Sequence, residues 1–140
     1  MNETTLPWML LEAFRHVDGE IQASLQDRGI SEIRPSQARA MLLVDRSGTR
    51  LGDLAERAQI TKQAMMQVVD DLVSSGLARR VPDPSDARAK IVKLTAKGLR
   101  QRAEARRALA SVEARAKRRL GDRRYEALRI ALVDLSSEEE

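Results

Sequence analysis

Four long side chains that can contact base pairs lie close together in the middle of the chain: Lys62, Gln63, Met66 and Gln67. On one face of a helix, glutamine can pair with an adenine edge, lysine with guanine or phosphate, and a methionine methyl with thymine. A solvated helix face carries the same residue types, so this pattern alone gives the two interpretations about equal weight. The charged residues further along the chain favour the first.

A second group of charged residues, Asp86, Arg88 and Lys90, follows a proline-containing segment. The sequence predicts short half-buried strands over 77–81 and 90–94, joined by a projecting loop of eight residues. An arginine on a thin loop can enter a minor groove of DNA, and Asp86 can hold the Arg88 guanidinium by a bidentate ion pair. The alternative is a solvated loop in which these two residues form a weak surface pair.

Residues suited to catalysis or metal binding are scarce. His16 is the only histidine, and the chain has no cysteine and no glycine-rich phosphate-binding loop. Asp70 and Asp71 are neighbours on one expected helix, so their carboxylates point in different directions and do not form a working pair. We therefore expect neither an enzyme nor a resident metal or cofactor. The lack of cysteine also excludes disulfides and zinc-thiolate sites.

A helix-turn-helix would present the first group of residues. Apolar residues at 54, 58, 60, 65 and 68 fit the wedge between two crossing helices, and the small Ala55 fits the point where the backbones approach. Thr61 suits the N-cap of the second helix, because its hydroxyl can accept from free amides of the first turn, and Gly76 suits its end. Helical spacing predicts an inward face made of Ala64, Met65, Val68, Val69, Leu72 and Val73.

Basic charge is concentrated in one part of the chain. The 140 residues carry a formal net charge of +4, with residues 1–78 at −3, residues 79–124 at +11 and residues 125–140 at −4. Such a basic region attracts polyanions and gives salt-dependent binding through counterion release. We assign phosphate contacts to the segment around Arg88, since the arginines of the following long helix need not all face DNA.

The composition indicates one soluble domain. Hydrophobic residues make up 42% of the chain and charged residues 33%, which suffices for a core and a solvated surface. No apolar run approaches the length of a membrane span, and the N-terminus lacks a signal-like apolar core. We expect a cytoplasmic protein with no membrane partner.

Three segments together carry a family resemblance: 60–65 (ITKQAM), 83–88 (DPSDAR) and 94–98 (LTAKG). They are similar to the corresponding parts of the MarR family of bacterial transcriptional regulators, and the resemblance extends over nearly the whole chain. Its most specific element is the pair Asp86 and Arg88. Gln59 is a departure, because many helix-turn-helix units carry glycine there.

The resemblance implies a mainly α fold with a small β-hairpin wing. The single domain, 1–140, would comprise a winged helix-turn-helix lobe (31–98), a long linking helix (99–120) and dimerisation helices (1–30 and 121–140). In this family the recognition helix enters the major groove and the wing arginine enters the minor groove. The residues assigned to DNA binding are Thr61, Lys62, Gln63, Met66, Gln67, Asp86, Arg88 and Lys90.

Apolar residues recur at helical spacing toward both ends of the chain. The first stripe, after Thr5 and Pro7 and before Gly29, is Leu10, Phe14, Val17, Ile21 and Leu25. The long helix carries Leu99, Ala103, Leu109, Val112, Ala116 and Leu120, and the last helix carries Tyr125, Leu128, Leu132 and Leu135 after Gly121, with Asp122 as its cap. The small lobe cannot bury all of them, so they cover one another in a homodimer, as the resemblance implies, or in an intramolecular bundle.

These features lead to a functional hypothesis: a homodimeric, ligand-responsive repressor that binds an inverted repeat in double-stranded DNA. The resemblance also implies a small aromatic or anionic effector between the dimer base and the DNA-binding lobe. Trp8, Arg15 and His16 could line its cleft, and they fit equally well as packing and surface residues. The alternative function is a winged-helix interaction or adaptor module that does not read DNA. RNA binding has less support because aromatic residues for base stacking are scarce.

Overall fold

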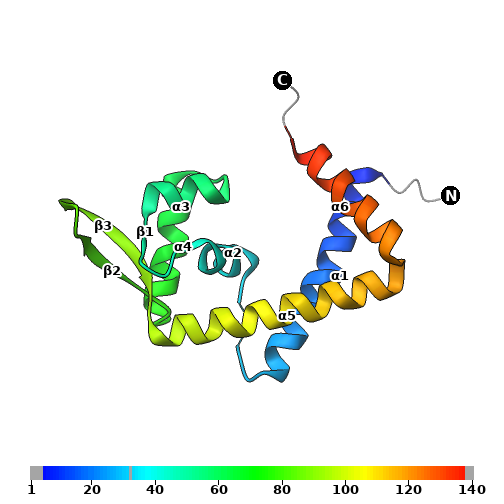
Figure 1. Cartoon of the computed structure of the whole chain (residues 1–140), viewed down its shortest axis with the longest axis horizontal. Coiled ribbons are helices and arrows are strands. Elements are labelled where there is room, and N and C mark those ends of the chain that lie inside the picture. The colour runs from blue at the N-terminus through cyan, green and yellow to red at the C-terminus, as the bar shows by residue number, and fades with distance from the viewer. Residues whose placement is uncertain (1–4, 32, 138–140) are drawn as a thin grey trace.

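The computed structural model describes residues 5–31 and 33–137. In chain order the elements are α1 (Leu6–Asp27), α2 (Pro35–Leu43), β1 (Thr49–Arg50), α3 (Leu51–Ala58), α4 (Lys62–Ser74), β2 (Ala78–Asp83), β3 (Asp86–Leu94), α5 (Ala96–Leu120) and α6 (Asp122–Ser136). Figure 1 shows α2, α3, α4 and the sheet gathered at one end of α5, with α1 and α6 toward its other end. We call the first group, residues 35–94, the lobe, and α1 with α6 the base. This mainly helical fold with a small sheet confirms the expected fold class.

The helix-turn-helix forms as the sequence predicts. Leu54 and Ala55 of α3 are buried against Met65 of α4, so the small residue does lie where the two helices meet. Thr61 is the N-cap of α4, and its Oγ1 accepts a hydrogen bond of 3.1 Å from the Ala64 amide. Gln59 adopts the left-handed conformation that the turn requires, at φ 56° and ψ 41°. The turn geometry is therefore kept without glycine, at a cost of about 1 kcal/mol in backbone strain.

The prediction of an inward side chain was wrong for two residues. Ile60 is 39% exposed, and Ala64 is also exposed. Ile60 lies in the turn before α4, and Ala64 lies in the first turn of α4. Periodicity gives the direction of a side chain but not the position along the helix at which its neighbours end.

The predicted eight-residue loop between the strands was also wrong. Strands β2 and β3 pair antiparallel from Ala78 opposite Leu94 to Pro82 opposite Lys90, and only Pro84 and Ser85 join them. The strand order is β1-β3-β2, so β2 is an edge strand and can carry a proline, which has no N–H for a second neighbour. The prolines and aspartates typical of a loop are here part of an extended ribbon, which we call the wing (residues 78–94).

The ends of the long helices differ in how they are capped. Helix α1 begins after Thr5, and Gly29 follows it at φ +75°. Helix α5 begins with Thr95 as its N-cap, whose Oγ1 accepts a hydrogen bond of 3.1 Å from the Gly98 amide. Asp122 does not cap α6, contrary to expectation: it is the first residue of the helix, after Gly121, and its Oδ1 lies 4.0 Å from Lys117 Nζ.

The described residues form two apolar clusters. The larger fills the lobe and includes Met41, Val69 and Leu72, while the smaller joins α1 to α5 through Leu25 and Ala108. Large apolar side chains on α1 and α6 remain exposed, namely Leu6, Trp8, Met9, Leu10, Leu11, Phe14, Val17, Leu128, Ile130, Leu132, Val133 and Leu135. Helix α6 has no buried residue within the described part of the chain. In the described ranges, every helix is too short or too polar to cross a membrane.

Candidate nucleic-acid interface

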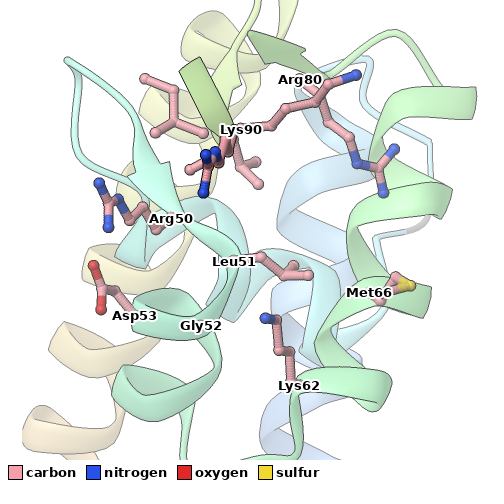
Figure 2. A pocket seen from close by; sticks show the side chains of 12 residues that line it. Arg50, Leu51, Gly52, Asp53, Lys62, Met66, Arg80 and Lys90 are labelled. Carbon is pink, nitrogen blue, oxygen red and sulfur yellow. The ribbon is translucent and has the colours of Figure 1, made fainter. Parts of the chain in front are cut away.

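A basic groove of about 540 Å³ lies between the start of α4, the start of α3 and the wing. Figure 2 shows Lys62 and Met66 of α4 on one side, Arg50 and Asp53 on the other, and Lys90 above them. The groove is lined by Arg50, Leu51, Gly52, Asp53, Lys62, Met66, Arg80, Arg88, Ala89, Lys90, Ile91 and Val92. Five of these are cations and one is an acid, so the groove suits a polyanion.

The contact face predicted for α4 is solvent-accessible. Lys62, Gln63, Met66 and Gln67 are all exposed, and Met66 retains 44% of its surface. They lie in the first turn and a half of the helix, next to the exposed N-terminal amides that a phosphate can approach. Thr61 is also exposed, but its hydroxyl oxygen already accepts the capping bond, so it serves first to fix the start of the helix.

The wing brings its cations to one face of the sheet. Successive side chains of a strand alternate between faces, so Arg88 and Lys90 share a face with Val92, and Arg80 joins them because it lies opposite Val92 in β2. Arg79 points to the other face. The sheet register thus turns Arg80, Arg88 and Lys90, from two neighbouring strands, toward the groove.

The prediction of an ion pair between Asp86 and Arg88 was wrong. The Asp86 carboxylate Oδ1 accepts a hydrogen bond of 3.0 Å from the backbone amide of Arg88. No carboxylate of the described chain lies within ion-pair distance of Lys62, Arg88 or Lys90, although all three are exposed. Asp86 shapes the backbone at the start of β3, and the Arg88 guanidinium stays available for an external anion.

The wing is fastened to the start of α3 by Arg50 and Asp83. Nε and Nη2 of Arg50 each lie 2.7 Å from Oδ2 of Asp83, which is 8% exposed. Its other oxygen, Oδ1, accepts from the Ser85 amide at 2.9 Å and from the Ser85 hydroxyl at 2.7 Å. The bonds from Ser85, together with Arg50, lower the pKa of Asp83 to about 2. One carboxylate therefore forms the turn of the wing and attaches it to the helix-turn-helix.

A second attachment joins strand β2 of the wing to α4. Arg80 of β2 forms an ion pair and hydrogen bond with Asp70 of α4. Next to Asp70, Asp71 Oδ2 lies 2.8 Å from Arg34 Nη2, so the two neighbouring aspartates connect α4 to two different segments, β2 and the residue before α2. The Arg80–Asp70 pair thus joins the wing to α4, and the Arg50–Asp83 pair joins it to the start of α3.

Sequence reasoning missed Arg50 and Arg80 as groove residues. A longer β2–β3 pairing would have revealed Arg80, because its register places it on the face of Lys90. Arg50 directly precedes α3, but nothing in the sequence shows that a carboxylate 33 positions later comes within reach of it. Only the folded sheet brings these two segments together.

Comparisons with known proteins agree with this geometry. A sequence profile described as MarR family matches residues 31–89, and no curated protein matches the chain. The transcriptional repressor CouR, solved bound to a 23-mer DNA duplex, is 27% identical with a TM-score of 0.80, covering 95% of this chain and 93% of its own. CouR bound to p-coumaroyl-CoA is 25% identical with a TM-score of 0.82, covering 99% of this chain and 98% of its own.

A more distant structure has the same fold. A mutant of MarR from E. coli complexed with operator DNA is 19% identical with a TM-score of 0.78, and the match covers 94% of both chains. At this identity the likeness concerns the fold alone. The profile match over the helix-turn-helix and most of the wing, together with the near full-length likeness to CouR, confirms the resemblance of this chain to the MarR family of transcriptional regulators.

Proposed function

We propose that this protein is a homodimeric repressor that binds an inverted repeat in double-stranded DNA. The observation that carries the proposal is the groove between α4 and the wing, in which Lys62, Arg88 and Lys90 are exposed and have no ion-pair partner in the described chain. Cations that are not neutralised by the protein's own carboxylates release counterions from DNA when they meet phosphates.

The two protruding elements would divide the work of recognition. Helix α4 enters the major groove, where Gln63 and Gln67 contact base edges and Lys62 contacts guanine or phosphate. The wing follows the backbone, so that Arg88 reaches the adjacent minor groove. Asp86 contributes indirectly, since it holds the backbone amide of Arg88. Lys90, deeper in the groove, contacts phosphate.

The homodimer is supported by apolar surface on the base. The exposed side chains on α1 and α6 include Trp8, Phe14 and Val133, which retain 53%, 53% and 65% of their surface. Exposed apolar patches of this extent mark an interface. Two copies that cover these helices would place two recognition helices about one DNA turn, roughly 34 Å, apart.

We further propose that a small aromatic or anionic effector lowers the affinity for DNA. The relative CouR has been solved with p-coumaroyl-CoA, which has both properties. In this chain an open cleft of about 1030 Å³ lies between the lobe and α6, lined by Arg39, Gln59, Leu132, Val133, Ser136 and Ser137. Trp8, Arg15 and His16 are exposed on α1, so an effector role for them stays a prediction.

Binding to selected DNA tests the main proposal. The protein is used to select duplexes from a random pool, and affinity for the selected duplex and for a scrambled one is then measured at two salt concentrations. A regulator retains a preference of about 10³-fold or more for the selected site as salt rises, although both affinities fall. A preference that disappears at the higher salt would instead indicate an adaptor with non-specific affinity for DNA.

The effector is tested on the same duplex. The gel-shift assay is repeated with p-coumaroyl-CoA, free phenolic acids and purine acids. The proposal predicts that at least one of them releases DNA, because it favours a dimer with misplaced recognition helices. Unchanged affinity with all of them would contradict control by this class of molecule.

A further inference from the structure

Arg102 is a charged side chain buried where α5 crosses α2. It is 8% exposed, and its Nη1 donates to the Val44 carbonyl at 2.6 Å and to the Met41 carbonyl at 3.4 Å. These carbonyls belong to the C-terminal end of α2, where the helix dipole favours a cation. Burial is the main cause that lowers the pKa of Arg102, with a further contribution from Arg106.

Burying a guanidinium between two helices is unfavourable in free energy. An apolar side chain of similar volume would give comparable or better stability, because a buried charge loses its hydration. No carboxylate of the described residues forms an ion pair with Arg102, so two carbonyl groups take that place. The hydrogen bonds from Nη1 of Arg102 specify direction, which an apolar contact does not.

The N-terminal turn of α5 is attached to the end of α4. The Thr95 amide donates to the Leu77 carbonyl at 3.0 Å, and the Thr95 hydroxyl donates to the Gly76 carbonyl at 2.6 Å. Lys97 Nζ donates to the Ser75 carbonyl at 3.1 Å. Helix α5 therefore meets the lobe at two places, the end of α4 and the end of α2, and two points define the direction of a rod.

Helix α5 is joined to α1 and to the segment after it by two ion pairs. Arg28 of the segment after α1 lies 3.1 Å from Glu104, and Arg115 lies 3.2 Å from Glu20. From Arg102 to Leu120 the helix runs on for about 27 Å, at about 1.5 Å per residue. A tilt of about 10° at the lobe would displace that far end by about 5 Å, more than the spacing of roughly 3.4 Å between base pairs.

We propose that Arg102 is a positioning residue that fixes the direction of α5 relative to the lobe, and thereby sets the separation of the two recognition helices. The inference rests on the proposed homodimer and inverted repeat. In this arrangement Arg102 determines which spacing between half-sites the protein accepts, and the groove residues contact the bases of each half-site.

Arg57 supplies a matched control. Its Nη1 donates to the Leu43 carbonyl at 3.0 Å and its Nη2 lies 3.0 Å from Asp45 Oδ2, so it also holds the end of α2. It does so from α3, within the lobe, and none of the hydrogen bonds and ion pairs found for it among the described residues reaches α5. Arg57→Gln therefore loosens the same helix end without freeing the linking helix.

The first measurement is binding to spaced duplexes. The duplex that the wild-type protein selects is remade with one base pair inserted or removed between the half-sites. We expect the wild type and Arg57→Gln to lose affinity on the order of tenfold or more on the altered duplexes, as for a mismatched base pair. Arg102→Met should show a loss of about threefold or less, because a free lobe can adjust to either spacing.

The second measurement needs no DNA. The chain has no cysteine, so a spin label on Glu56→Cys, an exposed position of α3, reports the distance between the lobes of a dimer. We expect a narrow distribution for the wild type and Arg57→Gln, and a broad one for Arg102→Met. If Arg102→Met does not fold, Arg102→Lys keeps the charge but lacks the rigid planar group that places Nη1 against the two carbonyls, and should broaden the distribution and flatten the spacing dependence.

The outcomes separate the two hypotheses. A folded Arg102 variant with the wild-type spacing preference and a narrow distance distribution would overturn the role of Arg102 and leave the proposed function intact. A wild-type protein that is monomeric, or that accepts every spacing equally, would overturn the proposed function and with it this inference.

Discussion

At the scale of single residues, the groove separates side chains that are held within the protein from side chains that are available to a partner. Arg50 and Arg80 are paired with Asp83 and Asp70, so their charges are largely committed to fixing the wing. Arg88, by contrast, makes no ion pair within the described ranges and is exposed in the outer half of β3. The position of Arg88 in the ribbon makes it the residue whose removal reports most directly on DNA contact.

We predict that Arg88→Ala weakens binding to the selected duplex by about 1–3 kcal/mol, because one groove contact is lost. Its unfolding midpoint in urea should stay within experimental error of the wild type, since the side chain is exposed. Fluorescence anisotropy with a labelled duplex measures the first quantity. Arg79→Ala, on the opposite face of the wing, is the control; an equal loss in both variants would point to general charge rather than to a groove contact.

Asp83 predicts a pH dependence of stability. The folded state lowers its pKa from 3.8 to about 2, so the stabilisation from its bonds is fully present above pH 3.8 and is lost as the pH falls toward 2. In Asp83→Asn the amide oxygen can still accept from Ser85, but the charge that pairs with Arg50 is gone. Urea unfolding between pH 5 and pH 2 should therefore show a smaller acid-induced decrease in this variant than in the wild type.

The control for this experiment is Asp86→Asn, which removes another wing carboxylate that makes no ion pair in the described chain. It should keep the steeper acid-induced decrease of the wild type. If Asp83→Asn instead followed the wild-type curve through the whole range, the bonds to Ser85 and Arg50 would not be what stabilises the wing.

At the scale of elements, the sequence predicted what local rules determine. The cap at Thr61, the break at Gly76 and the order of helices follow from hydroxyl chemistry, left-handed backbone and apolar spacing, which act over a few residues. The wing could not be predicted in the same way. Pro82 and Asp83 are typical of a loop, and only pairing with β3 on one side of β2 makes them part of a strand.

Long-range ionic contacts escaped prediction for the same reason. The partners Arg50 and Asp83, and the contact of Arg102 with the end of α2, depend on how distant segments meet. Each of these arginines would fit a solvated surface on its own. In a chain with 25 lysines and arginines, burial and partner distances are needed to separate the few that hold the fold from the rest.

Helix α5 makes a close approach to the chain before the wing at Gly98. A Cβ atom at this position would lie 1.9 Å from the Leu77 carbonyl oxygen, which is backbone and cannot rotate away. We predict that Gly98→Ala destabilises the protein by about 1–3 kcal/mol or more, because α5 must shift from the end of α4. Thermal or urea unfolding measures the loss.

Gly52→Ala is the matched substitution, since Gly52 lies in α3 and a Cβ there meets nothing within 4 Å. It should be neutral or stabilise the protein by up to about 1 kcal/mol, as expected for glycine to alanine in a helix. Equal effects at the two positions would contradict the close approach as the cause.

At the scale of the whole molecule, the lobe buries its apolar side chains, whereas the base leaves many of its apolar side chains exposed. The lobe buries its apolar residues around Leu54, Met65 and Leu72, whereas α6 buries none of its described residues. A single copy thus carries a stable DNA-binding unit on a base that needs a further surface. The described structure gives the base its shape, and dimerisation remains our proposal.

We predict that Val133→Glu, at a position 65% exposed on α6, shifts the protein from dimer to monomer. A buried carboxylate without a partner costs several kcal/mol in an apolar interface, which is comparable with the free energy of a typical dimer. Sedimentation velocity measures the mass. The monomer should keep its fold and lose the preference for an inverted repeat over a single half-site.

Arg124→Glu places the same carboxylate at an exposed site in the first turn of α6, where the helix dipole favours it. This control should stay dimeric. If Val133→Glu sedimented as a dimer as well, α6 would lie outside the interface and the intramolecular arrangement of the base would gain support.

The proline opposite Lys90 has a consequence for how the protein behaves at high concentration. A ribbon that projects into solvent offers its outer strand as a template on which strands of other molecules can add, the first step toward fibrils. Pro82 removes one donor from that strand, and the irregular register beside Asp83 bends the ribbon. The protein can therefore expose a long β-ribbon to its partner without self-association through that ribbon.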